Sequence, residues 1–265
     1  MKVLIKLGGT LLDQEKTRTR LAGEIVAASR TGAQIVVVHG GGKQMTQFLA
    51  ERGVESRFVD GLRVTTPEVL DAVLKVLAGT VNQQLVAALV AAGANAVGLS
   101  GMDALLTEAE PMSAELGHVG RVARANGSLL DLLASSGYLP VVACVAGDRS
   151  GNFYNVNADQ MAAACAFGFG ASKLVFLTDV EGVRNSESVI CPTLTFSECR
   201  RLIDQQIATG GMQAKLEAAM AALENGVDEV TIAPGARPGI IEDLFANRPL
   251  GTRLVVERVE LTANG

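Results

Sequence analysis

Val3-Leu4-Ile5-Lys6-Leu7-Gly8-Gly9 is a run of apolar, strand-forming residues that ends in two glycines and carries one lysine. A similar pattern returns at Ile35-Val36-Val37-Val38-His39-Gly40-Gly41-Gly42. A β-branched run followed by glycines and then by a helical pattern is typical of an α/β protein that binds an anion. Glycine lets backbone N–H groups approach a ligand, and the positive end of the next helix attracts negative charge. These two stretches, with a lysine inside the first strand, predict a phosphate-handling site.

Strand-like and helical patterns alternate along the whole chain. Short apolar runs predict strands at 3–7, 36–38, 96–100, 140–146, 173–178, 230–233 and 253–256. Apolar residues at three-to-four spacing predict helices at 21–28, 43–52, 67–92, 129–135, 158–170, 194–207, 212–225 and 239–246. Buried strands alternating with helices predict an α/β protein with a mainly parallel central sheet. Helices cover both faces of that sheet, which makes a three-layer αβα sandwich.

The domain organisation follows from what interrupts this alternation. The stretch Leu105–Asn126 is polar and glycine-spaced, and we interpret it as a hairpin or an excursion from the sheet. The sequence has no obvious linker. We therefore expect two lobes that share one sheet and meet near residue 170, an N-terminal lobe at 1–170 and a C-terminal lobe at 171–265.

The bulk composition argues against several classes of partner. The net charge of −5 argues against nucleic acid, which binds a basic face. We find no apolar stretch of the ~18 residues that a membrane span needs, and no signal peptide before the first strand. We therefore expect a cytoplasmic protein without a membrane partner. The 4 cysteines show no CxxC spacing, and the 2 histidines complete no zinc set with them. We expect inert, reduced thiols and no metal held by the protein itself.

The lysine in the first strand indicates a functional site more strongly than the glycine run does. Gly40-Gly41-Gly42-Lys43 is not a Walker loop, because the GxxxxGK[ST] spacing is absent and Gln44 stands in place of Ser or Thr. Glycines also suit tight strand-to-helix turns, so a purely structural role stays open here. Lys6 is more informative, since an ammonium in an apolar strand is costly unless it is paired or aimed at a site. The alternative for Lys6 is an edge strand from which its ammonium extends to solvent.

Two polar segments precede predicted helices. In Tyr154–Asp159, either Asn157 or Asp159 can cap the alanine-rich helix that follows. A cap explains one polar residue of this segment, and Asp159 can also pair with lysines. Lys215 falls in the first turn of the predicted helix after Gly210-Gly211, where its charge opposes the helix dipole unless an anion binds there. A surface position is the alternative for Lys215.

Arg63 lies in Gly61-Leu62-Arg63-Val64-Thr65, just before the strongly apolar helix at 67–92. A guanidinium suits bidentate capture of a carboxylate, and a solvated loop arginine is the alternative.

Taken in order along the chain, these segments resemble the amino-acid kinase family. The segments that carry the resemblance are 6–9, 39–42, 61–65, 115–120, 137–142, 155–159, 177–183 and 211–215. Each is modest by itself, but together they span essentially the whole chain in the order of the family. The resemblance implies the family's fold, with the amino-acid substrate in the first lobe and the nucleotide in the second.

Within the family, the chain is most similar to members that phosphorylate the side-chain carboxylate of N-acetyl-L-glutamate with ATP and Mg²⁺, a step of arginine biosynthesis. The chemistry is consistent with this resemblance. A carboxylate is already ionised at pH 7, so its phosphorylation requires no general base. Phosphoryl transfer needs positioning and positive charge, which two lysines and glycine N–H groups supply. The resemblance implies that the Mg²⁺ is carried mainly by ATP oxygens.

The resemblance also implies roles for individual residues. The implied catalytic residues are Lys6 and Lys215, which stabilise the migrating phosphoryl group, and Asp159, which holds both lysines. The implied substrate contacts are Gly41, Gly42, Asn155 and Arg63, with Arg63 on the α-carboxylate. The implied ATP contacts are Gly8, Gly9, Asp179, Val180, Glu181, Gly182, Val183, Arg184, Ile207, Ala208 and Thr209.

Regulation and assembly are further expectations. Arginine-inhibited members carry an extra N-terminal helix that links dimers into a hexameric ring, whereas here Met1-Lys2 leads directly into the first strand. We expect a homodimer insensitive to arginine, with the apolar helix at 67–92 either at the interface or in the core.

Two other functions stay open. One is a kinase of N-acetyl-aminoadipate in lysine biosynthesis, since one methylene in a pocket is worth only ~1–3 kcal/mol. The other is a non-catalytic amino-acid sensor, against which the retention of Lys6, Asp159 and Lys215 argues.

Overall fold

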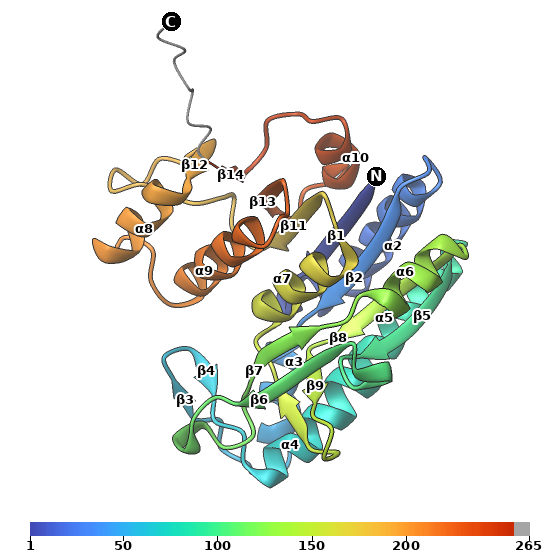
Figure 1. Ribbon diagram of the computed structural model, residues 1–265, viewed down its shortest axis with the longest axis vertical. Helices are drawn as coiled ribbons and strands as arrows, with labels where there is room; N and C mark the ends of the chain where they lie inside the picture. The colour runs from blue at the N-terminus through green and yellow to red at the C-terminus, as the bar shows by residue number, and fades with distance from the viewer. Residues whose placement is uncertain (257–265) are drawn as a thin grey trace, which may run out of the picture.

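The structure of the protein is a computed structural model in which residues 1–256 are described, and residues 257–265 of the predicted second lobe lie outside the described residues. The strands of the main sheet are β1 (Lys2–Leu7), β2 (Gln34–His39), β5 (Asn95–Ser100), β8 (Tyr138–Ala143), β11 (Lys173–Thr178), β12 (Thr193–Thr195), β13 (Glu229–Pro234) and β14 (Thr252–Val255). They form an 8-stranded sheet in the order β12-β14-β13-β11-β1-β2-β8-β5 (Figure 1). Strands β13 to β5 in this order pair in parallel, whereas β14 runs antiparallel to β13. The mainly parallel sheet predicted from the sequence is therefore confirmed.

Helices cover both faces of this sheet. One layer consists of α2 (Glu15–Ser29), α5 (Asn82–Ala91) and α10 (Ile240–Phe245), in which α2 packs against both of the others. The opposite layer consists of α6 (Ser128–Ser135), α7 (Ala158–Phe169), α8 (Phe196–Asp204) and α9 (Gly210–Glu224), packed in the order α6-α7-α9-α8. The three-layer αβα arrangement is confirmed.

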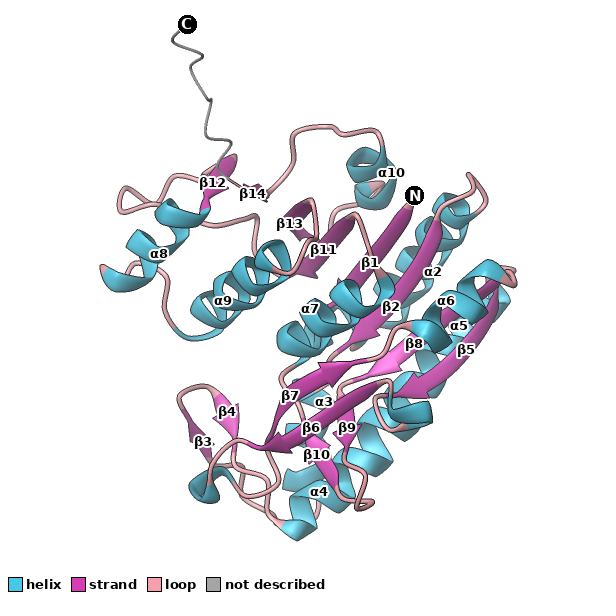
Figure 2. Ribbon diagram, in the orientation of Figure 1, coloured by secondary structure: helices cyan, strands magenta, loops and turns pink. Residues whose placement is uncertain are grey.

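A smaller sheet lies at one end of the molecule, beside α4 (Pro67–Val73) and opposite α10 (Figure 2). Its strands β6 (Thr107–Pro111), β7 (Gly120–Ala125), β9 (Val145–Gly147) and β10 (Phe153–Asn155) lie in the order β10-β9-β6-β7. The antiparallel β6–β7 pair confirms the hairpin predicted within Leu105–Asn126. The remaining elements are β3 (Phe58–Val59), β4 (Leu62–Arg63), α1 (Gly9–Leu12), α3 (Gly42–Ala50), the π-helical η1 (Leu74–Val81), η2 (Asp103–Leu105) and η3 (Ala114–Leu116).

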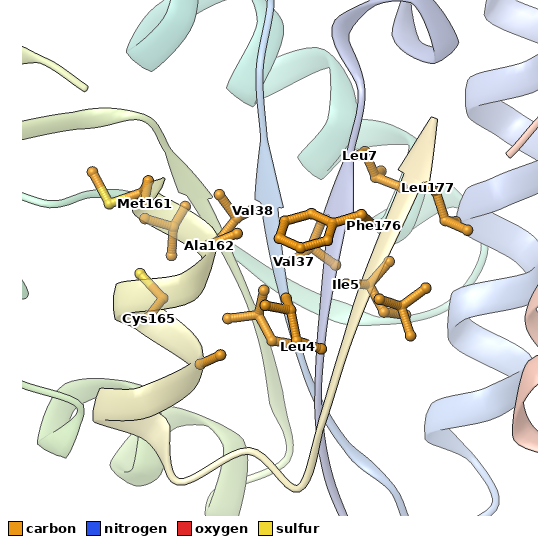
Figure 3. Packing of buried hydrophobic residues seen from close by; sticks show 14 of the residues in the cluster. Leu4, Ile5, Leu7, Val37, Val38, Met161, Ala162, Cys165, Phe176 and Leu177 are labelled. Atoms are coloured by element: carbon orange, nitrogen blue, oxygen red, sulfur yellow. The ribbon is translucent and has the colours of Figure 1, made fainter. Parts of the chain in front are cut away.

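Strand β1 directs its side chains alternately to the two helix layers. In Figure 3, Leu4 lies on the side of α7, where Met161 and Cys165 are, whereas Ile5 lies on the other side of the sheet. Successive residues of a strand point to opposite faces, so Lys6 lies on the same face as Leu4. The pattern of β1 thus places one ammonium beneath α7 within an otherwise apolar core.

Two predicted elements differ from the structure. The predicted helix at 194–207 is wrong at its start, because Leu194 is buried in β12 opposite Leu254 of β14. Helix α8 then begins after Thr195, which forms a capping box with Glu198. The predicted strand at 140–146 is divided at Cys144 between β8 and β9, which belong to different sheets.

The helical segment Pro67–Ala91 corrects another expectation. This helical segment has 25 residues, and its most apolar 18-residue window has a mean hydropathy of 1.5, so it is long and apolar enough to cross a membrane by length and composition. The statement that the chain has no such stretch is therefore wrong. Its α5 part packs against α2 and β5, where Leu85 and Leu89 are fully buried, and 39% of the most apolar window is buried inside the structure.

Candidate active site

The carboxyl ends of β2, β1 and β11 lie side by side because these strands are parallel neighbours. The Gly8 N–H donates to Leu177 O at 2.9 Å, and the Gly40 N–H donates to Leu7 O at 3.2 Å. A Cβ on Gly9 would lie 3.1 Å from the backbone nitrogens of both Gly41 and Gly42. The structure therefore brings the two glycine segments of the sequence face to face, at a separation that favours glycine.

Lys6, Asp159 and Lys215 form one ion-pair cluster beside these glycines. Lys6 Nζ lies 2.7 Å from Asp159 Oδ1, and Lys215 Nζ lies 3.0 Å from Asp159 Oδ2. Lys6 is 5% exposed and Asp159 is 4% exposed, so the cluster is largely removed from water. The sequence-based prediction that Asp159 holds lysines by salt bridges is confirmed, and the edge-strand alternative for Lys6 is excluded because β1 is central in the sheet.

Each member of this cluster comes from a different element. Lys6 lies on β1, Asp159 lies in the first turn of α7, and Lys215 lies on α9. Asn157 is the N-cap of α7, where its Oδ1 accepts from the Asp159 N–H at 2.9 Å and from the Gln160 N–H at 3.2 Å. The cap therefore fixes the first turn of α7 and, with it, the backbone that carries Asp159.

The expectation that Lys215 lies in the first turn of its helix, where its charge would oppose the helix dipole, is wrong. Helix α9 begins at Gly210 rather than at Met212, so Lys215 lies in its second turn. The macrodipole acts mainly within the first turn. The charge of Lys215 is instead balanced by Asp159, and its side chain is 15% exposed.

Burial and charge act against each other in this cluster. Burial lowers the pKa of Lys6, Asp159 opposes this effect, and the neighbouring Lys215 adds to it. Burial alone would raise the pKa of Asp159, but the ammonium groups of Lys6 and Lys215 outweigh it and the pKa is lowered. Cys144, next to Lys6, has its pKa raised by burial to about 11. The geometry of the cluster is that of one carboxylate with an ammonium group on each oxygen, and a thiol lies beside it.

The lowered pKa of Lys6 predicts that activity falls at a lower pH than the ordinary pKa of a lysine would give. We expect kcat/KM for the carboxylate substrate that the resemblance implies to fall as the pH rises through the pKa of Lys6, which lies below the ordinary lysine value of 10.5. The reason is that deprotonation of Lys6 removes one positive charge from the cluster. The measurement is a kcat/KM profile from about pH 7 to pH 10.5, with circular dichroism at each pH as a control for unfolding. A flat profile over this range, with the fold intact, would contradict the expectation.

Arg63 is held by side chains that the sequence did not identify. Its Nη1 donates to Ser56 Oγ, and its Nη2 donates to Thr46 Oγ1 at 2.7 Å and to Gly42 O at 3.1 Å. The guanidinium carbon lies 4.7 Å from the ring centroid of Phe58. Arg63 is 9% exposed and lies on β4, so the alternative of a solvated loop arginine is excluded. Burial lowers the pKa of Arg63, yet an arginine stays charged in a protein.

Asn155 is connected to the same hairpin. Its Nδ2 donates to Thr65 Oγ1 at 3.0 Å, and Thr65 Oγ1 donates to Arg63 O at 2.8 Å. Thr65 is fully buried and was missed, because a threonine between two elements carries no periodic signal. Gly41, Gly42, Arg63, Asn155 and Asn157 line a common cavity of about 180 Å³. The structure therefore brings all predicted substrate contacts to one cavity.

The segments predicted to contact ATP lie in the C-terminal half of the chain, apart from Gly8 and Gly9. Residues 179–184 follow β11, and residues 207–209 precede α9. Asp179, Val180, Glu181, Arg184 and Thr209 are exposed, whereas Gly182, Val183 and Ala208 are buried. Val183 is held in place by its N–H, which donates to Thr252 Oγ1 at 2.8 Å. These segments are not part of the cavity beside Arg63.

Side chains that could bind a metal ion do not form a cluster in the part of the chain that the structure describes. Within residues 1–256, we find no group of three or more His, Cys, Asp and Glu side chains that could hold a metal ion.

A doubly wound sheet with two glycine loops and a Lys–Asp–Lys cluster at its carboxyl edge defines a phosphate-handling α/β protein, and the comparisons with known proteins identify the family. The family model "Amino acid kinase family" matches residues 1–234, and the chain belongs to this family. The chain is 60% identical over 255 residues to an acetylglutamate kinase of Solibacter usitatus, covering 96% of this chain and 99% of that one. It is 44% identical over 238 residues to an acetylglutamate kinase of Geobacillus kaustophilus, covering 88% and 90%.

Solved structures agree with this assignment. An N-acetylglutamate synthase of Neisseria gonorrhoeae, in complex with coenzyme A and N-acetyl-glutamate, superposes with a TM-score of 0.86 at 27% identity. The match covers 97% of this chain and 60% of the synthase chain. A carbamate kinase of Giardia matches with a TM-score of 0.69 at 16% identity, which shows a shared fold.

Proposed function

We propose that this chain transfers the γ-phosphoryl group of ATP to the side-chain carboxylate of N-acetyl-L-glutamate, giving N-acetyl-L-glutamyl 5-phosphate in arginine biosynthesis. The observation that carries this proposal is the Lys6–Asp159–Lys215 cluster beside two facing glycine loops. The 60% identity to an acetylglutamate kinase over 96% of the chain supports the choice of substrate.

The chemistry of this reaction requires little from the protein beyond charge and position. A carboxylate oxygen of the acceptor attacks the γ-phosphorus, the bond to the bridging oxygen breaks, and ADP leaves with the electron pair. The acceptor is already ionised at neutral pH, so no base is needed. Lys6 and Lys215 stabilise the negative charge of the transferred group, and Asp159 holds the two ammonium groups in position.

The two lobes divide the substrates in this proposal. The N-terminal lobe, residues 1–170, binds the amino acid through Gly41, Gly42, Asn155 and Arg63, with Arg63 on the α-carboxylate. The C-terminal lobe, residues 171–265, binds ATP through 179–184 and 207–209, and Gly8 and Gly9 lie near the transferred phosphate. When bound together with ATP, Mg²⁺ would neutralise phosphate charge. We propose a cytoplasmic enzyme without a nucleic-acid or membrane partner.

Hydroxamate formation tests the proposal directly. Hydroxylamine traps an acyl phosphate, so we expect hydroxamate from N-acetyl-L-glutamate and MgATP, and much less from N-acetyl-aminoadipate, aspartate or carbamate. A signal with N-acetyl-aminoadipate alone would move the enzyme to lysine biosynthesis with the same mechanism. No signal with any acceptor would contradict a kinase and favour an amino-acid sensor.

Arg63 provides a test of the substrate's orientation. We expect Arg63→Met to raise KM for N-acetyl-L-glutamate about 100-fold, because a charge-assisted bidentate contact to a carboxylate is worth roughly 1.5–3 kcal/mol. The KM for ATP is expected to change little. Arg57→Met is the matched control, since Arg57 is exposed and precedes the same hairpin. A KM increase for ATP alone would contradict the proposed role of Arg63.

We further propose a homodimer whose interface includes the outer face of the Pro67–Ala91 helix. Val90 on this face is 52% exposed, and Leu74 and Val86 are partly buried. Light scattering is expected to give about twice the chain mass of 27.5 kDa. Val90→Glu is expected to shift the protein toward the monomer, since a buried unpaired charge disfavours an interface. A monomeric wild-type protein would contradict this assembly.

A further inference from the structure

His39 is a fully buried histidine that the reaction described above does not use. It is the last residue of β2 and directly precedes the glycine loop. Its Nδ1 lies 3.0 Å from Gly40 O, and its Nε2 lies 3.0 Å from Nδ2 of Asn82. Asn82 is also buried, at 1% exposure. The two side chains therefore form a closed hydrogen-bonded pair behind the loop.

The partners of Asn82 determine which nitrogen of His39 carries the proton. Asn82 Nδ2 lies 3.0 Å from Val141 O, which can only accept, so this atom is the amide nitrogen. It therefore also donates to His39 Nε2, and the ring proton is on Nδ1, where it is donated to Gly40 O. Burial lowers the pKa of His39 to about 4, which keeps the ring in this neutral form at physiological pH. Each hydrogen bond in this series therefore has a defined donor and acceptor: Asn82 donates to Val141 O and to His39 Nε2, and His39 Nδ1 donates to Gly40 O.

This chain of hydrogen bonds acts on the glycine amides through the peptide bond. The peptide that joins Gly40 to Gly41 is planar and trans, so fixing its carbonyl also fixes the direction of the Gly41 N–H, which points the opposite way. Gly41 is the N-cap of α3 and Gly42 its first residue, so neither N–H has an intrahelical acceptor. Both nitrogens face Gly9, where the two glycine loops meet.

The π-helical η1 places the groups that contact this loop. A Cβ on Gly41 would lie 2.5 Å from Leu77 Cδ2 and 3.4 Å from Val81 Cγ2, so both side chains of η1 pack against the loop. Asn82 directly follows η1 and reaches His39. Wide π-turns within α-helices are frequent at functional sites, because they change which side chains share a face. Gly98 of β5 leaves room for Asn82, since a Cβ there would lie 2.2 Å from Asn82 Oδ1.

We propose that His39 and Asn82 are positioning residues, which orient the Gly40–Gly41 peptide so that the amides of Gly41 and Gly42 point at the acceptor. The proposal rests on the proposed function in that these amides bind the acceptor. Neither side chain acts as an acid or base. Their role is to hold in advance a geometry that the loop, made of three glycines, does not hold by itself.

The test uses variants that separate the two hydrogen bonds. His39→Leu removes both, whereas His39→Asn keeps an amide near the position of Nδ1 and loses only the bond to Asn82. Asn82→Leu leaves the ring without its outer partner. Leu89→Ala is the control, because Leu89 is fully buried on the same helical segment but lies away from the loop.

We expect His39→Leu to raise KM for N-acetyl-L-glutamate and to lower kcat, each by about ten-fold, with KM for ATP nearly unchanged. Asn82→Leu keeps the bond from His39 to Gly40 O, so it should show the same changes to a smaller extent. His39→Asn should recover much of the loss. Leu89→Ala should lower Tm and leave both KM values unchanged. If His39→Leu also lowers only Tm, His39 is a packing residue and the proposal is overturned.

A second readout does not depend on the substrate. In ligand-free protein labelled with ¹⁵N-glycine, the amide resonances of Gly41 and Gly42 should shift or broaden in His39→Leu and stay in place in Leu89→Ala. A wild-type protein inactive on N-acetyl-L-glutamate would defeat the proposed function while this spectrum still tests the positioning. Unchanged glycine resonances in His39→Leu would overturn the positioning role itself.

Discussion

Replacing Lys6 by methionine is expected to lower kcat by about a thousand-fold, and Lys215→Met is expected to do the same. The ammonium groups of these residues flank Asp159 at 2.7 and 3.0 Å. They are the positive side chains of the buried cluster next to the glycine loops, so each variant removes a large part of the charge that stabilises the transferred phosphoryl group. Methionine keeps much of the lysine's apolar volume, and each variant leaves Asp159 with one ammonium, so the fold is expected to survive.

Lys2→Met is the matched control for this experiment. Lys2 lies on the same strand and also pairs with an aspartate, Asp131, but the two side chains are 34% and 46% exposed. We expect its kcat to stay within about two-fold of wild type, since exposed ion pairs contribute little. Steady-state kinetics and a thermal unfolding curve on each variant separate lost chemistry from lost structure. A Lys6→Met or Lys215→Met enzyme with near-normal kcat would remove that lysine from the mechanism.

Asp159→Asn is expected to be the most destabilising single change at the site. It leaves two ammonium groups in a buried position without their carboxylate, and breaking a buried pair in this way costs about 3–5 kcal/mol. We also expect kcat to fall about 100-fold, because the ammonium of Lys6 then loses its partner and its pKa falls further. The matched control is Asp131→Asn, whose exposed pair with Lys2 is worth about 1 kcal/mol or less.

The effect of Asp159 on stability is expected to depend on pH in a defined direction. The pKa of its carboxyl is lower in the folded protein than the unfolded value of about 3.9, so the folded state favours the ionised form. The stabilisation is fully present above the unfolded value and is lost as the pH falls through the folded value. Denaturant unfolding at neutral and acidic pH should therefore show the difference between wild type and Asp159→Asn shrinking toward acid. A difference that grows toward acid would contradict this assignment.

The cluster and the cavity differ in how far the sequence could predict them. Lys6 was identifiable because an ammonium in an apolar strand is energetically conspicuous, and Asp159 and Lys215 were identifiable from the resemblance to a family. The residues that hold Arg63, namely Ser56, Thr46 and Phe58, were not identifiable. They come from a loop, a helix and a two-residue strand, and polar residues at such places have no periodicity that marks them.

The ends of helices and strands were also only partly predictable from the sequence. The capping box Thr195–Glu198 was present in the sequence, yet the apolar residue Leu194 before it favoured an earlier helix start. Pairing with β14 decided in favour of a strand, which a local pattern does not contain. The start of α9 was displaced for a related reason, since Gly210 and Gly211 have low helix propensity and still lie within the helix.

The sequence by itself determined the alternation of strands and helices, the parallel sheet and the glycine loops that follow β1 and β2. These depend on hydrophobic periodicity and on glycine, which act between near neighbours in the chain. The meeting of Lys6, Asp159 and Lys215 was implied by the resemblance to a family, but it is the tertiary packing that brings them together, since 209 positions (215 − 6) separate the two lysines. Only the tertiary structure decided that Asn82 orients His39, because a wide helical turn sets which side chain faces the sheet. Contacts of this kind depend on how whole elements pack, and no local pattern encodes them.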